Sequence, residues 1–404
     1  MASNSYINVW WSIQYWRKLA INTNLQIQSL GGGTMNGNLP LRPEKVGIDG
    51  PRLRAAFQLL DEAVESGAIP GAVAVIGRGS DIAGRHAVGY AVKCEQEEQV
   101  LQMDTLFDCA SLTKVVVTLP LILILLDRGE LHLNEPVATF LPEFAVNGKD
   151  AVTVGQLLTH TSGLAAHRPF YAHDTTAEQI KAAVCNEPLA YESGTQVVYS
   201  DLGFIVLGEI AAKLYGCPLD EAAAHELFHP LGMRDSQFCP PDGLKSRIAA
   251  TEYREHLGRY QRGDVHDENA LALGGVSGHA GLFATAGDLA HYAAMWLANG
   301  AWEGQRILSS ASVAFATRSY TTHLQDNRGL GWALKGDSFD AAGDLFSTAT
   351  FGHTGFTGTS VWIDPERSLY AVLLTNRVHF GRETSIARLR ACFHNAVAAS
   401  VIAP

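Results

Sequence analysis

The chain has 404 residues, of which 47% are hydrophobic and 18% are charged, so it is long enough to bury a large core and to form two lobes. Its formal net charge is -11, and it contains no run of lysine or arginine. Phosphate backbones and anionic lipid surfaces would therefore repel it. The composition argues against a nucleic-acid-binding or membrane-surface protein and predicts an ordinary soluble globular one.

The cysteines and the N-terminus bear on the compartment. Six cysteines are scattered singly and form no Cys-x-x-Cys pair, so they predict neither a zinc site nor a redox motif. The first residues lack the charged, apolar and small-residue regions of a secretory signal. Gly31–Gly33 ahead of Met35 looks like a linker, and we expect residues 1–40 to be an extension. Free thiols and the missing signal together predict a cytoplasmic protein.

The first folded elements are a helix and a hairpin. Apolar residues recur at helical spacing in Leu53, Phe57, Leu60 and Val64. Asp49 precedes them as a favoured N-cap and Gly67 follows as a stop signal. Gly71–Ile76 and His86–Val92 are β-prone segments on either side of turn residues at 79–81, which predicts a β-hairpin.

The middle of the chain reads as helical. Val115–Leu126 is the longest apolar run, with 12 residues and an interior proline. It is well short of the roughly 20 residues that span a bilayer, so we interpret it as a buried helix. From about Val115 to Ala270 the pattern stays mostly helical, with loops at 165–174 and 238–245.

The C-terminal end repeats the pattern of the N-terminal end. Thr359–Ile363 and Leu369–Leu374 flank turn residues at 364–367, and a helical spacing follows in Ile386, Leu389, Phe393 and Val397. The sequence therefore predicts an α/β (α+β) domain, an antiparallel sheet flanked by helices, from residues 41–114 and 271–404. An all-helical domain, residues 115–270, is inserted between them.

Ser111 and Lys114 open the apolar helix. A lysine three residues after a serine lies about one helical turn away on the same face, so its amine can reach the hydroxyl. The helix start also favours negative charge on the serine oxygen. To act as a base the lysine must be neutral, and burial can lower its pKa. The alternative is a capping serine with a surface lysine, but Lys114 precedes an apolar run and not a solvated face.

Two later segments supply what a Ser-x-x-Lys site needs besides the nucleophile. Tyr199 stands on a loop ahead of an apolar helix, and Gly352–Phe356 is a glycine-flanked strand edge. A tyrosine can relay a proton to the leaving group, and the backbone of a strand can hold the acyl group. The three elements occur in the order Ser-x-x-Lys, Tyr, strand.

Further motifs accompany these elements, namely Asp127–Leu131, Leu157–Leu164, Pro230–Met233 and Gly278–Phe283. With this series, about residues 41–401 resemble the superfamily of class C β-lactamases and penicillin-binding proteins, and most closely the family VIII carboxylesterases. The resemblance implies a β-lactamase-like fold, Ser111 as nucleophile, and Lys114 with Tyr199 as the activating and proton-relaying pair. It also implies an oxyanion hole from the backbone N–H groups of Ser111 and Phe356. No cofactor is implied.

The sequence departs from this family at two places. His353-Thr354-Gly355 stands where true β-lactamases have Lys-Thr-Gly, so a cation for the substrate carboxylate is lost, because histidine is mostly neutral near pH 7. His353 is either a strand residue bonded to a carbonyl or a pocket wall, and its flanking glycines, which permit close approach of a ligand, favour the wall. Asp201 stands where the family has asparagine. It either pairs with Lys114, which we favour, or attracts a substrate ammonium group.

A competing motif is His225-Glu226-x-x-His229, in which the histidines would bind zinc and Glu226 would act as base. Pro230 follows the second histidine at once, whereas a metzincin helix continues to the later glycine. We keep a zinc metallopeptidase as a remote alternative.

The sequence thus predicts a carboxylesterase of β-lactamase-like type that cleaves small-molecule, short-chain esters through an acyl-enzyme on Ser111. A β-lactamase, a D-Ala-D-Ala carboxypeptidase or a D-aminopeptidase using the same site is the main alternative. A sensor that stays acylated is a third reading. We expect His160 and His279 to be structural. The oligomeric state is not predicted.

Overall fold

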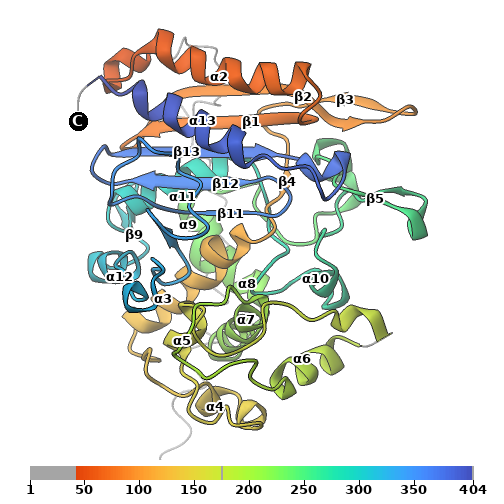
Figure 1. Ribbon diagram of the computed structural model, residues 1–404, viewed down its shortest axis with the longest axis vertical. Coiled ribbons are helices and arrows are strands. Elements are labelled where there is room, and N and C mark those ends of the chain that lie inside the picture. The colour runs from red at the N-terminus through yellow and green to blue at the C-terminus, as the bar shows by residue number, and fades with distance from the viewer. Residues whose placement is uncertain (1–41, 174–175, 403–404) are drawn as a thin grey trace, which may run out of the picture. The chain divides into compact units, whose positions relative to one another are not determined.

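The computed structural model describes residues 42–173 and 176–402, and the expected extension at residues 1–40 lies outside them. A seven-stranded antiparallel sheet has the order β10-β11-β12-β13-β1-β2-β3 (Figure 1). Its strands are β1 (Gly71–Arg78), β2 (Asp81–Lys93), β3 (Glu98–Val100), β10 (Ala333–Leu334), β11 (Phe351–Thr354), β12 (Ser360–Asp364) and β13 (Leu369–Thr375). Both predicted strand pairs are present.

The central strands are buried on both faces, and their side chains divide between two cores. Val73 and Val75 of β1 face one core, whereas Ala72, Ala74 and Ile76 face the other. This division follows from the two-residue period of a strand. Strand β13 alternates in the same way. A sheet buried on both faces needs helices on both of them.

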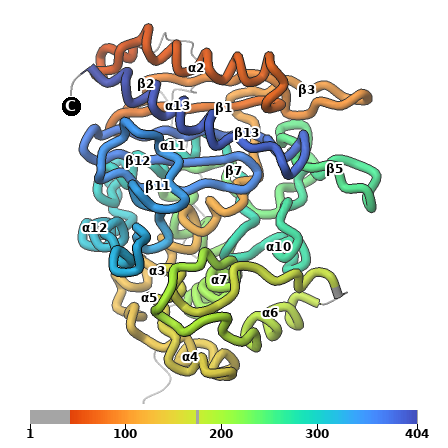
Figure 2. The backbone as a smooth tube through the Cα atoms, in the orientation of Figure 1, coloured from red at the N-terminus to blue at the C-terminus, as the bar shows by residue number. Residues whose placement is uncertain are grey.

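Three long helices cover the sheet. Helices α2 (Gly50–Glu65) and α13 (Ala387–Ala399) pack together on one face, and α11 (Ala286–Leu297) covers the other. Helix α2 begins where the sequence predicts, because the Asp49 side chain accepts a hydrogen bond from the Arg52 N–H at 2.9 Å. The two ends of the described chain thus form one layered structure, with β1 and β13 side by side (Figure 2).

The intervening residues are mostly helical and lie beyond the sheet (Figure 1). The helices are α3 (Leu119–Asp127), α4 (Val137–Phe140), α5 (Val154–Leu158), α6 (Ala177–Asn186), α7 (Asp201–Tyr215), α8 (Leu219–Ala223), α9 (His229–Leu231), α10 (Glu268–Ala272) and α12 (Ser310–Ala316). Short strand pairs are β4 (Phe107–Asp108) with β7 (Phe283–Ala284), β5 (Tyr253–Arg254) with β6 (Arg259–Tyr260), and β8 (Ala301–Trp302) with β9 (Gln305–Arg306).

Two helices begin with a wide π-turn, and a proline follows each turn. The π-turn Lys114–Thr118 leads into α3 with Pro120, and the π-turn Ala224–Phe228 leads into α9 with Pro230. Proline lacks an N–H and its ring crowds the carbonyl four residues earlier, so a regular α-turn is unfavourable there. The buried helix predicted at 115–126 is therefore present with a π-turn at its start.

The structure confirms the predicted fold class. The predicted boundaries of the inserted domain, residues 115–270, stay a prediction. One residue within them contacts the sheet, because the Ala250 N–H donates to the carbonyl of Ala91 on β2 at 2.8 Å.

Among the described residues, no single helix has the length and hydropathy of a membrane span. Helix α7 and the segment Leu219–Leu231 reach this length and hydropathy when they are taken together, but they are bent by 74° from each other.

Gly278 allows α7 to approach the chain that leads into the β4–β7 pair. A Cβ atom at Gly278 would lie 2.1 Å from the Phe204 carbonyl oxygen and 2.8 Å from the Cα of Gly208. We expect Gly278→Ala to lower the free energy of unfolding by about 1–3 kcal/mol, because backbone on both sides must move. Gly243 has nothing within 4 Å of such a Cβ, so Gly243→Ala should change stability by less than about 0.5 kcal/mol. Urea denaturation of both variants measures this difference, and equal stabilities would contradict the packing argument.

Candidate active site

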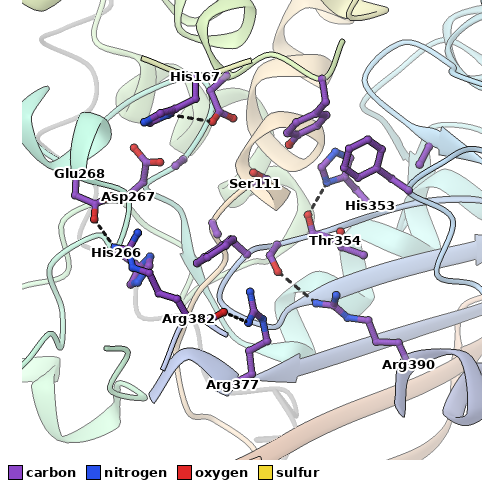
Figure 3. A pocket seen from close by; sticks show the side chains of 18 of the residues that line it. Ser111, His167, His266, Asp267, Glu268, His353, Thr354, Arg377, Arg382 and Arg390 are labelled. Atoms are coloured by element: carbon purple, nitrogen blue, oxygen red, sulfur yellow. Dashed lines mark hydrogen bonds and ion pairs between the residues drawn. The ribbon is translucent and has the colours of Figure 1, made fainter. Parts of the chain in front are cut away.

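Several polar and charged side chains line a pocket of about 430 Å³, a size typical of small-molecule sites. Ser111 lies at its centre (Figure 3). The remaining walls come from the loops before α7 and α10, from the end of β11 and from the chain after β13. Five of the predicted site residues line this pocket, namely Ser111, Tyr199, Asp201, His353 and Phe356.

Ser111 projects from a strained turn between β4 and the buried helix. Ala110 has a φ of +46°, a conformation that costs a non-glycine residue energy and needs support. The buried Asp108 provides it, because its Oδ1 accepts from the Ala110 N–H at 2.8 Å and its Oδ2 accepts from the His266 N–H at 2.6 Å. One carboxylate therefore holds both the turn of Ser111 and a wall of the pocket.

Lys114 is fully buried behind Ser111. Its Nζ donates to Ser111 Oγ at 3.0 Å, to Asp201 Oδ1 at 2.8 Å and to the His279 carbonyl at 3.2 Å. Burial lowers the pKa of Lys114, but the charges of Asp201 and Tyr199 outweigh this effect and raise the pKa to about 12. The neutral lysine that a general base requires is not the state that this pairing favours, because the Asp201 carboxylate compensates the buried charge.

Tyr199 lies between this lysine and the third motif. Its ring centroid is 4.9 Å from Lys114 Nζ and 5.7 Å from the ring of His353. Within the described chain its buried hydroxyl has no hydrogen-bond partner, so it is available to a substrate. The loop is braced by His160, whose Nδ1 accepts from the Ser200 N–H at 3.0 Å and whose carbonyl accepts from the Val198 N–H at 2.9 Å.

Asp201 is the first residue of α7, after the N-cap Ser200. One of its oxygens bonds Lys114, and the other lies 3.8 Å from Nδ1 of His167. Burial alone would raise the pKa of Asp201, but Lys114 and His167 together hold it well below its usual range. Of the two roles that the sequence left open, the structure shows the pairing with Lys114.

His353 combines the two roles considered for it. Its Nδ1 donates to the Thr354 carbonyl at 2.8 Å, and its ring lines the pocket (Figure 3). Burial, followed by the charges of Arg328 and Lys114, lowers the pKa of His353 to about 3. At neutral pH this histidine therefore carries no charge.

The glycines flanking His353 make room for protein atoms. A Cβ on Gly352 would lie 2.4 Å from the ring of Trp362, and one on Gly355 would lie 2.5 Å from the Cys109 carbonyl oxygen. We expected these glycines to permit close approach of a ligand, but the contacts show that they make room for protein atoms. Gly355 lets the loop after β11 approach Cys109, in the turn between β4 and Ser111.

Two backbone N–H groups lie free at the pocket. Across residues 42–173 and 176–402, neither the Ser111 N–H nor the Phe356 N–H donates to a protein acceptor. Both residues line the pocket, and Gly355 between His353 and Phe356 donates to the Thr359 carbonyl at 2.8 Å. Free backbone N–H groups beside a nucleophile are the donors that acyl-transfer chemistry uses.

Comparison with known proteins agrees with this geometry. A sequence model of the β-lactamase family matches residues 56–394. The chain belongs to the β-lactamase family. It is thus a serine hydrolase of the β-lactamase fold, as the motifs predict.

Relatives of this β-lactamase-family protein carry different names. It is 33% identical over 366 residues, or 81% of both chains, to an "N-acetylmuramyl-L-alanine amidase" of Bacillus subtilis strain 168. It is 32% identical over 377 residues, 83% of this chain and 85% of the relative, to a "Putative D-alanyl-D-alanine carboxypeptidase" of Escherichia coli O157:H7. A solved family VIII carboxylesterase shares its fold with a TM-score of 0.69 and 21% identity, covering 87% of this chain and 98% of that one.

The zinc motif lies away from this pocket. His225 and Glu226 stand on a π-turn, and Glu226 accepts two hydrogen bonds from Arg128 at 2.7 and 2.9 Å. Among the described residues no group of three potential ligands surrounds His225 and His229. Within the described part of this β-lactamase-family protein, the motif therefore lacks a third metal ligand, and its glutamate is hydrogen-bonded to Arg128. This geometry does not fit a zincin site.

The sequence reasoning missed several charged residues of the site. Arg328 is buried with its guanidinium 5.5 Å from the Tyr199 ring centroid, and it forms an ion pair with Asp337 at 2.8 Å. Arg377 and Arg390 line the pocket below Ser111 in Figure 3. None of them belongs to a motif. For Arg390 the sequence did contain an indication of an unusual role, because this charged residue falls on the apolar stripe of its helix, four residues after Ile386.

We expect Asp201→Asn to change the titration of Lys114. The variant keeps an oxygen acceptor but removes the charge, so burial prevails and the pKa of Lys114 should fall from about 12 to below the ordinary value of 10.5. The pH profile of kcat/KM from about pH 7 to 11 should then gain an inflection that the wild type lacks. Superimposable profiles would show that Asp201 does not hold the charge of Lys114.

Proposed function

We propose that this protein hydrolyses short-chain carboxylic esters through an acyl-enzyme on Ser111. The observation that carries the proposal is the 3.0 Å contact between Lys114 Nζ and Ser111 Oγ at the centre of a pocket with two free backbone N–H groups. A serine hydroxyl that is hydrogen-bonded to a lysine, with a tyrosine hydroxyl and free backbone donors nearby, is an arrangement suited to acyl transfer.

In the acylation step Ser111 Oγ attacks the ester carbonyl carbon and loses its proton. Lys114 already carries its proton, so the acceptor must be another group, and the free hydroxyl of Tyr199 is the candidate when ionised. Lys114 Nζ lies 4.9 Å and the Arg328 guanidinium 5.5 Å from the centroid of its ring. The proton then passes through Tyr199 to the departing alkoxide, which leaves as the alcohol.

In the deacylation step a water molecule attacks the acyl carbon, gives one proton to Tyr199, and releases the acid while Ser111 Oγ regains a proton. The N–H groups of Ser111 and Phe356 would stabilise the oxyanion of both tetrahedral intermediates. Such a donor contributes a factor of about 10²–10³ in rate.

Esters are favoured over β-lactams because of His353. A β-lactam presents a carboxylate to the third-motif side chain, which in true β-lactamases is a lysine. Here that side chain is a neutral imidazole whose pKa lies at about 3. An ester needs no cation at this strand, because the relay handles its leaving group and backbone donors handle its oxyanion.

Hydrolysis of D-Ala-D-Ala peptides is a second candidate. The observation in its favour is that relatives 32% and 33% identical to this chain are named as a carboxypeptidase and an amidase. The same serine would attack an amide in place of an ester. A sensor that stays acylated would release one equivalent of product, whereas either hydrolase turns over continuously.

We expect Ser111→Ala to abolish ester hydrolysis, because no acyl-enzyme can form without the nucleophile. Lys114→Ala should be nearly as damaging, and the double variant little worse than either, because the residues act as one unit. Initial rates with p-nitrophenyl butyrate measure this.

Ser80→Ala is the matched control, since Ser80 is an exposed residue of the β1–β2 turn. Its rate should equal that of the wild type. More than a tenth of the wild-type rate in Ser111→Ala would remove Ser111 from the mechanism.

We expect p-nitrophenyl butyrate to be cleaved more efficiently than a cephalosporin at neutral pH. The loss of one charge-assisted hydrogen bond costs about 1.5–3 kcal/mol, or ten- to a hundredfold in kcat/KM. Because the pKa of His353 is about 3, cephalosporin turnover should not rise as the pH falls through about 6.5. His353→Lys should raise cephalosporin hydrolysis relative to ester hydrolysis. If the wild type cleaved the cephalosporin more efficiently than the ester, the proposed esterase function would be wrong and a β-lactamase function would take its place.

A further inference from the structure

Two arginines of the pocket have no acidic partner. Arg377, Arg382 and Arg390 all line it. Arg382 forms ion pairs with Glu252 and Glu268. Within residues 42–173 and 176–402, neither Arg377 nor Arg390 forms an ion pair. Glu383 is an acidic neighbour that acts on Arg377, but no ion pair forms between them. Two adjacent guanidinium groups without an ion pair are uncommon, because buried charges are normally paired.

Arg390 reaches the pocket from the first turn of α13. One of its terminal nitrogens donates to the Thr359 carbonyl at 2.9 Å and to the Gly355 carbonyl at 3.3 Å. Its Nε is buried and donates to no acceptor in the described chain. Burial, and then the charge of Arg377, lowers the pKa of Arg390 to about 9. The group is therefore still a cation at neutral pH, with a donor left unused.

Arg377 begins the 3-10 turn Arg377–Phe380 directly after β13. Its Nη1 donates to the carbonyls of Arg382, at 2.9 Å, and of Thr384. Its guanidinium lies 4.7 Å from the ring centroid of Phe356. Backbone carbonyls and an aromatic face thus fix the orientation of this side chain without neutralising it. Figure 3 shows Arg377 and Arg390 on the same side of Ser111.

We propose that Arg377 and Arg390 form a subsite for one carboxylate group of the substrate, so that the preferred esters are monoanionic. This inference rests on the proposed function and narrows its substrate class. A guanidinium pairs with a carboxylate in a planar geometry, and a bound carboxylate would supply the missing counter-ion. The two arginines belong to the 3-10 turn Arg377–Phe380 and to α13, so they are different side chains from His353, although Arg390 contacts the Gly355 carbonyl of the same motif.

The opposite wall favours a single negative charge. Asp201, Asp267 and Glu268 line the same pocket, and in Figure 3 Asp267 and Glu268 lie on the side away from Arg390. A dianion such as a phosphate monoester would meet more repulsion from these carboxylates than a monoanion would. One carboxylate held at the arginines would neutralise one of their two positive charges.

The test uses esters matched in length with and without a carboxylate. Mono-p-nitrophenyl glutarate carries a carboxylate on the acyl side, and p-nitrophenyl valerate is its neutral partner. 3-Butyryloxybenzoate carries a carboxylate on the alcohol side, and phenyl butyrate is its neutral partner. The measured quantity is the ratio of kcat/KM for the anionic ester to that for its neutral partner, which cancels general damage to the catalytic groups.

We expect the wild-type ratio to exceed one in at least one of the two pairs. Arg377→Gln should lower that ratio about ten- to a hundredfold, and Arg377→Lys should retain part of it because the charge remains. Arg382→Gln is the matched control, since Arg382 lines the same pocket but is already paired. It should change the ratio less than about twofold. An unchanged ratio in Arg377→Gln, or an equal fall in Arg382→Gln, would overturn the subsite.

A binding measurement separates this inference from the proposed function. Calorimetric titration of Ser111→Ala with monomethyl glutarate should show binding that the Ser111→Ala, Arg377→Gln double variant loses. If no ester is hydrolysed by the wild type but this binding is seen, the ester function fails and the subsite stands. If esters are hydrolysed but the two variants bind monomethyl glutarate equally, the subsite fails and the ester function stands.

Discussion

The Lys114 ammonium group has no solvent-exposed surface, and the Asp201 carboxylate 2.8 Å away balances its charge inside the protein. An isolated charge in that place would cost several kcal/mol, so the buried helix that starts at Lys114 needs Asp201 beside it. Asp201 is the first residue of α7, and its neighbours Tyr199 and Ser200 are held by His160. The ion pair thereby joins the segment of the nucleophile to the segment of the tyrosine.

This pair also sets the electrostatics of the whole pocket. With Lys114 charged and Arg328 buried nearby, cations lie behind the nucleophile, and both lower the pKa of His353 and of His160. His160 and His353 are therefore neutral, because burial and positive neighbours lower the pKa of both in the same direction. Asp267 and Glu268 lie on one side of the pocket, and Arg377 and Arg390, which form no ion pair within the described chain, lie on another (Figure 3).

Local sequence signals were sufficient for much of the fold and for the first members of the site. Asp49 caps α2 as its side-chain chemistry requires, and the spacing of Ser111 and Lys114 puts both on one helical face. The order of the motifs along the chain predicted the family. Contacts between distant segments had no such signal. The charge state of Lys114 depends on Asp201, which is 87 residues away, and no periodicity encodes that distance.

Arg377 and Arg390 illustrate the same limit. Arg377 follows a buried strand, and Arg390 interrupts an apolar stripe, which marks both as unusual. What they face becomes visible only when β13 and α13 are placed beside the loop after β11. Gly355 is a similar case, because the atom that demands a glycine there, the Cys109 carbonyl oxygen, belongs to another part of the chain.

The place of β13 in the sheet has a consequence for biosynthesis. This strand lies between β12 and β1, so one edge of β1 has no partner until residues 369–375 have been made. The ribosome has by then released most of the helices and the Ser111 segment. Pairings of such high sequence separation form late and leave strand edges exposed meanwhile. The nascent chain therefore carries its nucleophile long before it has a site, and chains that terminate before residue 369 lack a central strand.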